Sequence, residues 1–205
     1  MSDEIKTISD WLGTGSINIF GSPFAGKDTQ GKKLADLLGG VLIGGGDILR
    51  SHDEPLEIKK VLDSGGIIPS DFYLKMVLPY LSQDSFNKKP LILSAVGRRH
   101  GEEDIILDAT EKSGHSMKAV IMLNLIEQDV WKRFENKTLS HDRDDRADDA
   151  EEVIKTRLKK FKENTLPVIE YYRKKHLLIE INGALSRGEV TNEILKKLAQ
   201  LAQLH

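Results

Sequence analysis

Short apolar runs recur along the chain, and each is followed by a longer segment in which apolar residues return at helical spacing. Such short runs are typical of buried strands, whereas the longer periodic segments are typical of helices. The runs lie at residues 17–20, 41–43, 90–94, 117–123 and 176–181, and the clearest helical segments lie at 54–64, 70–81 and 190–204. With 205 residues, this alternation predicts one α/β domain.

An N-terminal extension, residues 1–15, precedes the first predicted strand. Ile5, Ile8 and Leu12 recur there at helical spacing. We expect a short helix laid on the body of the domain, and the sequence indicates no chemistry for it.

A glycine-framed loop, GSPFAGKDTQ, starts at Gly21 and joins the first strand to a helix. Gly21 and Gly26 permit backbone geometries that a Cβ would block, so successive N–H groups can point inward around an anion. The helix that opens at Lys27 adds its positive end; the lysine brings an ammonium to phosphates, and Thr29 brings a hydroxyl near a metal. The loop therefore predicts a triphosphate site. The usual pattern has Ser or Thr directly after the lysine, where this chain has Asp28, so a plain turn that caps a helix is the alternative.

Composition and charge narrow the class of protein. A net charge of −2 gives no basic footprint for nucleic acid, and the chain has no cysteine for a disulfide or a thiolate zinc site. No apolar run approaches a membrane span, and the first 16 residues lack the blocks of a signal peptide. We expect a cytoplasmic protein with no nucleic-acid partner, no membrane partner and no zinc.

Three further segments carry arginines that can meet an anionic ligand. A run of three glycines and an aspartate leads to Arg50, and Arg98 and Arg99 follow the run at 90–94, at the strand end where doubly wound sheets bind ligands. Residues 141–152 alternate arginine with aspartate, which suggests an exposed lid over an anion. The alternatives are that Arg50 and one of the paired arginines are solvated, and that the charged run is a solvated face.

In this order, these features resemble the adenylate kinase family of nucleoside monophosphate kinases, from about Ile17 to the C-terminus. The markers are Gly21-x-Pro23-x-x-Gly26-Lys27-x-Thr29-Gln30, Gly46-Asp47-Ile48-Leu49-Arg50, and Arg146-Ala147-Asp148-Asp149 with Arg157-Leu158. The family has glycine at the positions of Phe24 and Asp28.

The resemblance implies a P-loop three-layer α/β/α fold with a five-stranded parallel sheet, as a single domain over residues 1–205. It implies a helical insert that binds a nucleoside monophosphate near residues 46–80, and a short lid of the zinc-free type near residues 133–147. The activity it implies is ATP + AMP = 2 ADP, with Mg²⁺ accompanying ATP, in a monomeric enzyme.

The resemblance also assigns roles to single residues. The catalytic residues would be Lys27, Arg98, Arg133, Arg146 and Arg157. ATP would be bound by Gly21, Pro23, Ala25, Gly26, Lys27, Asp28, Thr29, Arg133 and Asn182. The monophosphate would be bound by Gly45, Arg50, Ile68, Arg98, Glu102, Arg146 and Arg157. The metal would be held by Thr29 and, through water, Asp28.

The chain departs from the family's pattern at strand-end and acceptor positions. Where the family has Asp-Gly-Phe-Pro-Arg, residues 94–98 read SAVGR, so Ser94 replaces a carboxylate that helps to hold hydrated magnesium. We hypothesise that Asp28 replaces that carboxylate from the other side of the metal. Glu102 stands in place of a base-reading glutamine, and Gly45 lacks the family's hydroxyl, which leaves GMP or CMP open as acceptors. Glu102 can equally be an ordinary first-turn residue of a helix, and a nucleotide-binding homologue with weak or no catalysis is a further alternative.

Overall fold

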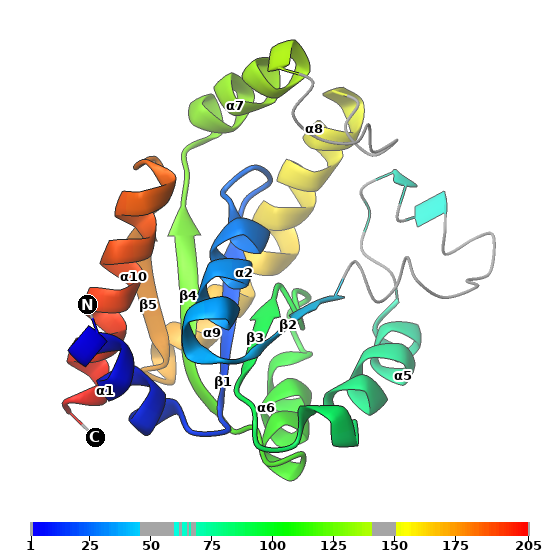
Figure 1. Ribbon diagram of the computed structural model, residues 1–205. Coiled ribbons are helices and arrows are strands. Elements are labelled where there is room, and N and C mark those ends of the chain that lie inside the picture. The colour runs from blue at the N-terminus through cyan, green and yellow to red at the C-terminus, as the bar shows by residue number, and fades with distance from the viewer. Residues whose placement is uncertain are drawn as a thin grey trace.

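The computed structural model describes residues 2–45, 60–61, 63–64, 66, 69–140 and 151–204. Within these ranges, five parallel strands form one sheet in the order β2-β3-β1-β4-β5 (Figure 1). The strands are β1 (Ser16–Gly21), β2 (Val41–Gly44), β3 (Leu91–Ser94), β4 (Met117–Asn124) and β5 (Leu178–Asn182). Each apolar run of the sequence forms one of these strands, which confirms the predicted fold class.

Helices cover both faces of the sheet and complete the three layers (Figure 1). One face carries α1 (Ser2–Leu12), α2 (Lys27–Leu38) and α10 (Arg187–Ala202), and the other carries α5 (Ser70–Leu81), α6 (Glu103–Lys112) and α9 (Leu166–Lys174). Two more helices, α7 (Glu127–Ser140) and α8 (Glu151–Lys160), extend past the carboxyl end of β4, and a π-helical turn (Phe161–Thr165) joins α8 to α9 (Figure 1). A 3₁₀ turn (Asp84–Phe86) precedes β3.

Alternation along the central strand β1 explains the two cores. Successive side chains of a strand point to opposite faces, so Ile17 and Ile19 pack with Leu34 of α2 on one side. Phe20 faces the other side, where its ring centroid lies 6.1 Å from that of Tyr172 in α9. All five side chains are fully buried. The central strand β1 therefore carries apolar side chains on both faces, which is why it appears in the sequence as an apolar run.

The predicted N-terminal helix is present as α1. Ile8 and Leu12 are buried and belong to the same core cluster as α10, so the extension packs against the last helix, with the two chain ends on the same side of the molecule (Figure 1). No helix within the described residues is both long and apolar enough to cross a membrane.

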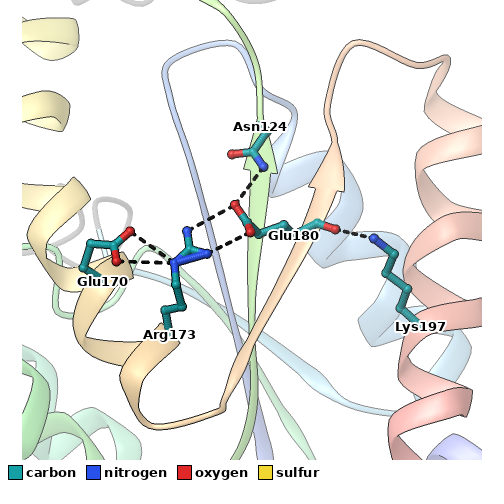
Figure 2. Close-up of polar contacts among 5 residues, drawn as sticks. All are labelled: Asn124, Glu170, Arg173, Glu180 and Lys197. Atoms are coloured by element: carbon teal, nitrogen blue, oxygen red, sulfur yellow. Dashed lines mark hydrogen bonds and ion pairs between the residues drawn. The ribbon is translucent and has the colours of Figure 1, made fainter.

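A polar network covers the edge strand β5 (Figure 2). The Arg173 guanidinium of α9 pairs with Glu170 at 3.2 Å and with Glu180 of β5 at 2.9 Å. Asn124 of β4 donates to the same Glu180 carboxylate at 3.2 Å, and Lys197 of α10 donates to the Glu180 carbonyl oxygen at 2.6 Å. An edge carbonyl that could pair with another chain is thereby occupied from within.

Parts of the predicted insert and lid lie outside the described residues, namely 46–59, 62, 65, 67–68 and 141–147. The helix predicted over 70–81 is present as α5, and residues 133–140 belong to α7.

Candidate active site

The loop from β1 to α2 needs glycine at both predicted positions. Gly26 immediately precedes α2 with φ 91°, a left-handed conformation that L side chains rarely adopt. A Cβ on Gly21 would lie 2.9 Å from the Ala25 Cβ and 3.0 Å from the Leu123 carbonyl oxygen, so these neighbours leave no room for a side chain. Gly26 is therefore required by its backbone conformation, and Gly21 by the space around it.

Lys27 is folded back over this loop. Its Nζ donates to the carbonyl oxygens of Gly21 and Ser22, each at 3.0 Å. The residue is also the first of α2, where helix N–H groups lack intrahelical partners and favour an anion. An ammonium and a helix N-terminus therefore meet at one place.

A pocket of about 430 Å³ opens at this helix end. Six of the residues predicted to bind ATP line it: Ala25, Gly26, Lys27, Asp28, Thr29 and Arg133. Gly21, Pro23 and Asn182 are not among the lining residues. Asn182 shapes the adjacent loop instead, because its carboxamide oxygen accepts a hydrogen bond from the Ala184 N–H at 3.0 Å.

Three further lining residues lie in segments that were predicted to contact ATP: Phe24 and Gln30 within residues 21–30, and Gly183 next to Asn182. Sequence reasoning missed the others, namely Asn136, Leu185, Ser186, Arg187 and Val190. Most belong to the segment after β5, where we predicted a helix only from Val190. The missed signal is Ser186-x-x-Glu189, a capping box that starts α10 at Arg187. It would have placed the helix N-terminus, and with it the far wall of the pocket.

Arg133 of α7 ties the two walls together. Its Nη1 donates to the Phe24 carbonyl oxygen at 3.0 Å, and its Nη2 donates to that of Gly183 at 2.7 Å. Phe24 adopts φ 60°, and its ring meets that of Phe134 edge-on at 5.9 Å. The P-loop, α7 and the loop after β5 therefore form one connected frame around the pocket.

Asp28 and Ser94 lie in contact although 66 residues separate them. The Ser94 hydroxyl donates to Asp28 Oδ1 at 2.7 Å. Their proximity follows from the sheet, because β1 pairs with β3 and Ile19 lies opposite Ser94 in the register. The carboxylate of the P-loop helix thus reaches the end of β3.

The loop between β3 and α6 is bonded within the fold. Asn18 donates to the Val96 carbonyl oxygen at 2.7 Å and accepts from the Val96 N–H at 3.3 Å. The Tyr73 hydroxyl accepts from the Gly97 N–H at 3.0 Å, and burial raises the pKa of Tyr73 well above its usual range. A Cβ on Gly45 would come within 3.0 Å of the same hydroxyl, so Tyr73 accounts for the glycine there.

Glu102 joins the start of α5 to the start of α6. It is 3% exposed; its Oε1 accepts from the Ser70 hydroxyl at 2.5 Å and its Oε2 from the Arg99 N–H at 3.2 Å. Both carboxylate oxygens are therefore used inside the protein. These bonds give Glu102 a structural role, which is to hold Ser70 and the Arg99 N–H. Its contact with an acceptor base stays a prediction.

The predicted phosphate-binding arginines are distributed over several elements. Arg98 is half-buried in the β3–α6 loop, and its carbonyl oxygen accepts from the Thr165 hydroxyl at 3.1 Å. Arg157 is half-buried on α8. Arg50, Ile68 and Arg146 lie outside the described residues.

Comparison with known proteins points to one family. The model of the adenylate kinase family matches residues 19–177. An adenylate kinase of Petrotoga mobilis is 32% identical over 209 residues, covering 87% of this chain and 95% of that protein. Adenylate kinase 1 of Nostoc sp. PCC 7120 is 34% identical over 179 residues, covering 85% and 93%. A gluconokinase from Sinorhizobium meliloti 1021 shares the fold, with a TM-score of 0.64 at 19% identity over 93% of this chain and 95% of that one. The P-loop geometry and these matches together show that the chain belongs to the adenylate kinase family.

Proposed function

We propose that this chain transfers the γ-phosphoryl group of ATP to AMP and releases two ADP. The observation that carries the proposal is the pocket in which Lys27 and the N-terminus of α2 face the loop after β5, with Arg133 joined to both walls. Amides and an ammonium at one end suit a triphosphate. The apolar side chains of Leu185 and Val190 at the other end suit a base.

The chemistry would consist of positioning and charge stabilisation. Phosphoryl transfer requires an in-line acceptor and cations around the transferring group, and an ionised acceptor phosphate needs no general base. Lys27 would follow the transferring phosphoryl group. Arg98, with Arg50, would hold the acceptor phosphate, and Arg133, Arg146 and Arg157 would neutralise the charge that develops.

Mg²⁺ would accompany ATP, as is general in this family. The described side chains fit this ion, because the Thr29 hydroxyl and the Asp28 carboxylate are hard oxygen donors that line the pocket. Thr29 and, through water, Asp28 would hold it. When bound, the ion neutralises negative charge on the phosphates.

We propose AMP as the acceptor. In the sequence, Glu102 was the main reason to consider GMP or CMP, and in the structure its carboxylate makes contacts within the protein. Its two oxygens accept from the Ser70 hydroxyl and the Arg99 N–H, so the carboxylate has a structural role that needs no contact with guanine or cytosine. The side chain missing at Gly45 is explained by the neighbouring Tyr73 hydroxyl. An acceptor-binding insert near residues 46–80 and a lid near residues 133–147 remain part of the proposal.

The test is a coupled ADP-release assay with ATP, Mg²⁺ and each of AMP, GMP, CMP, UMP and dTMP in turn. We expect AMP to give the highest kcat/KM. A preference for GMP or CMP would keep the kinase chemistry and return the base-reading role to Glu102. ATP binding without turnover on any of the five acceptors would replace the kinase by a non-catalytic nucleotide-binding protein.

A further inference from the structure

We infer that Asp28 and Ser94 act as one unit, in which Ser94 is a positioning residue that aims the Asp28 carboxylate at the hydration shell of the metal ion bound with ATP. The inference rests on the proposed function, since it takes a metal–ATP complex as the donor. It goes further by making the metal site depend on a pair of side chains from two separate elements.

The hydrogen bond between the pair fixes one oxygen of the carboxylate and leaves the other open. Ser94 is 5% exposed at the end of β3, and its hydroxyl donates to Asp28 Oδ1 at 2.7 Å. Over the described part of the chain, no hydrogen bond reaches Asp28 Oδ2, and the residue is exposed at the pocket. A buried donor thus holds an exposed carboxylate by one oxygen, and among the described residues no donor occupies the other.

The charges that line the pocket indicate what the Asp28 carboxylate does. Asp28 supplies the only carboxylate among the described lining residues, whereas Lys27, Arg133 and Arg187 supply positive charge. A carboxylate next to a triphosphate is repelled by it unless a cation lies between them. An acidic side chain in the first turn of the P-loop helix therefore opposes binding of the bare nucleotide and favours the nucleotide with a divalent cation.

The ligand preferences of Mg²⁺ fit this arrangement. The ion is octahedral, keeps several water molecules, and is bound in phosphotransferases through one or two carboxylates together with substrate phosphates. Residues that orient a metal ligand by a hydrogen bond are needed for full affinity. Thr29 lines the same pocket one position beyond Asp28 and adds a hydroxyl oxygen. Ser94 then has the orienting role.

In the family's pattern the carboxylate is at the strand end, the position of Ser94, and glycine is in the helix, the position of Asp28. Because Ser94 and Asp28 touch, a carboxylate attached at either position reaches nearly the same point. The Asp28 carboxylate lies beside the end of β3, and the side of the metal from which it would act stays a prediction. The contact makes an exchange of the two residues a direct test.

The experiment measures metal affinity separately from turnover. Mn²⁺ is titrated into the full-length protein with a non-hydrolysable ATP analogue, and free Mn²⁺ is read by electron paramagnetic resonance. Binding of the analogue is measured in parallel with all metal chelated. The variants are Asp28→Asn, Asp28→Gly, Ser94→Ala and the exchange Asp28→Gly/Ser94→Asp, with Asp36→Asn as the control, an exposed carboxylate further along the same helix.

We expect Asp28→Asn to weaken Mn²⁺ binding by about 10-fold or more, and Ser94→Ala to weaken it by a smaller factor. Metal-free binding of the analogue should not weaken, because a repelling charge has been removed. The exchange variant should recover most of the affinity lost in Asp28→Gly, and Asp36→Asn should behave as the wild type. Unchanged Mn²⁺ affinity in Asp28→Asn, or an exchange variant no tighter than Asp28→Gly, would overturn the inference.

The result separates this inference from the proposed function. A wild type that binds Mn²⁺ through Asp28 but transfers no phosphoryl group to any nucleoside monophosphate would refute the function and keep the pair. A wild type that turns over AMP while Asp28→Asn keeps full Mn²⁺ affinity would refute only the pair.

Discussion

Two loops leave the same edge of the sheet, after the neighbouring strands β1 and β3, and they use their backbone amides in opposite ways. In the β3–α6 loop, four backbone N–H groups donate to side chains: Val96 to Asn18, Gly97 to Tyr73, Arg99 to Glu102, and Gly101 to Glu103. The β1–α2 loop instead ends in a helix N-terminus that lines an open pocket. Buried or crowded amides need partners. The β3–α6 loop finds them in side chains, whereas the β1–α2 loop bonds the Ala25 N–H to the Ser22 carbonyl oxygen and brings the N-terminus of α2 to the pocket.

We call the β3–α6 loop, residues 95–102, the rigid rim because its amides are bonded within the fold, whereas the β1–α2 loop lines the candidate site. In the β3–α6 loop, side chains from β1, α5 and α6 fill the acceptor positions, and Thr165 fixes the Arg98 carbonyl oxygen. Arg98 is thereby presented from a backbone that has little freedom to move. Substitutions in the two loops should have different effects. A change in the β1–α2 loop should lower turnover, and a change in the β3–α6 loop should lower stability.

The largest effect is expected for Lys27→Met in the P-loop. Removing a cation that meets charge developing on the transferring group should lower kcat by about 10²-fold or more, with little change in the unfolding midpoint. Steady-state kinetics with ATP and AMP measure the change. Lys32→Met, an exposed lysine on the same helix, is the control and should keep wild-type turnover. A near-normal rate for Lys27→Met would remove the lysine from the mechanism.

In the rigid loop, Tyr73→Phe should act on stability. It leaves the Gly97 N–H without its acceptor in a buried place, which should cost about 1–3 kcal/mol of unfolding free energy. Urea denaturation measures the loss. Tyr80→Phe on the same helix is the control, because no hydrogen bond of its hydroxyl is present within the described residues. A loss no greater than that of the control would contradict the rigid-rim description.

The frame around the pocket can be tested at Phe24, whose ring packs on Phe134 of α7. Both substitutions to leucine should be destabilising, and the double variant should be less destabilised than the sum of the single ones. The coupling free energy should be about 0.5–1.5 kcal/mol, as for other aromatic pairs. Denaturation of the four proteins measures it. Additive losses would show that the contact between the two rings does not couple the P-loop to α7.

A smaller effect is expected at the far wall, where Ser186 caps α10. Ser186→Ala should cost about 1 kcal/mol of stability. The Ser186 hydrogen bond lowers the pKa of Glu189 below 4.5, so the contribution of this carboxylate is present above pH 4.5 and is lost as the pH falls through its folded-state pKa. Thermal unfolding between pH 3 and 7 should therefore show a difference between the wild type and the variant that narrows at acid pH, where only the bond from the Glu189 N–H to the Ser186 hydroxyl remains. A difference in stability that does not change with pH would assign the whole effect to the bond between the Glu189 N–H and the Ser186 hydroxyl.

The smallest effect is expected far from both loops, in the network of Figure 2. Arg173→Ala breaks exposed ion pairs with Glu170 and Glu180. Such pairs contribute less than about 1 kcal/mol, and salt screens them. Denaturation at low and high NaCl should show a small loss that shrinks with salt, and turnover should not change. A large, salt-independent loss would mean that the network covers the β5 edge in a way that packing cannot replace.

Local patterns were sufficient for the elements whose reasons are local. The P-loop could be predicted because Gly21, Gly26 and Lys27 act within a few residues of one another, and the apolar runs because buried parallel strands are apolar on both faces. The start of α10 was placed at Val190 although a capping box at Ser186 was present in the sequence. That error came from a signal that was overlooked.

Other features depend on which segments the fold brings together. The sequence offered Glu102 as a base-reading residue and did not indicate that Ser70 and the Arg99 N–H would occupy both of its oxygens. Phe24 stands in a left-handed conformation where the family has glycine, and its packing on α7 explains how a large side chain is kept there. Neither contact follows from spacing along the chain.

By itself, the sequence determined the fold class, the glycine-framed loop between β1 and α2, and the family, because each depends on short-range geometry or on residue order. Only the tertiary structure decided that Asp28 meets Ser94, that Arg133 joins the P-loop to Gly183, and that Tyr73 of α5 accepts from the Gly97 N–H of the β3–α6 loop. These contacts join residues 24 to 109 positions apart. They arise because strand order and helix packing bring distant segments to the same edge of the sheet, and no local pattern encodes that order.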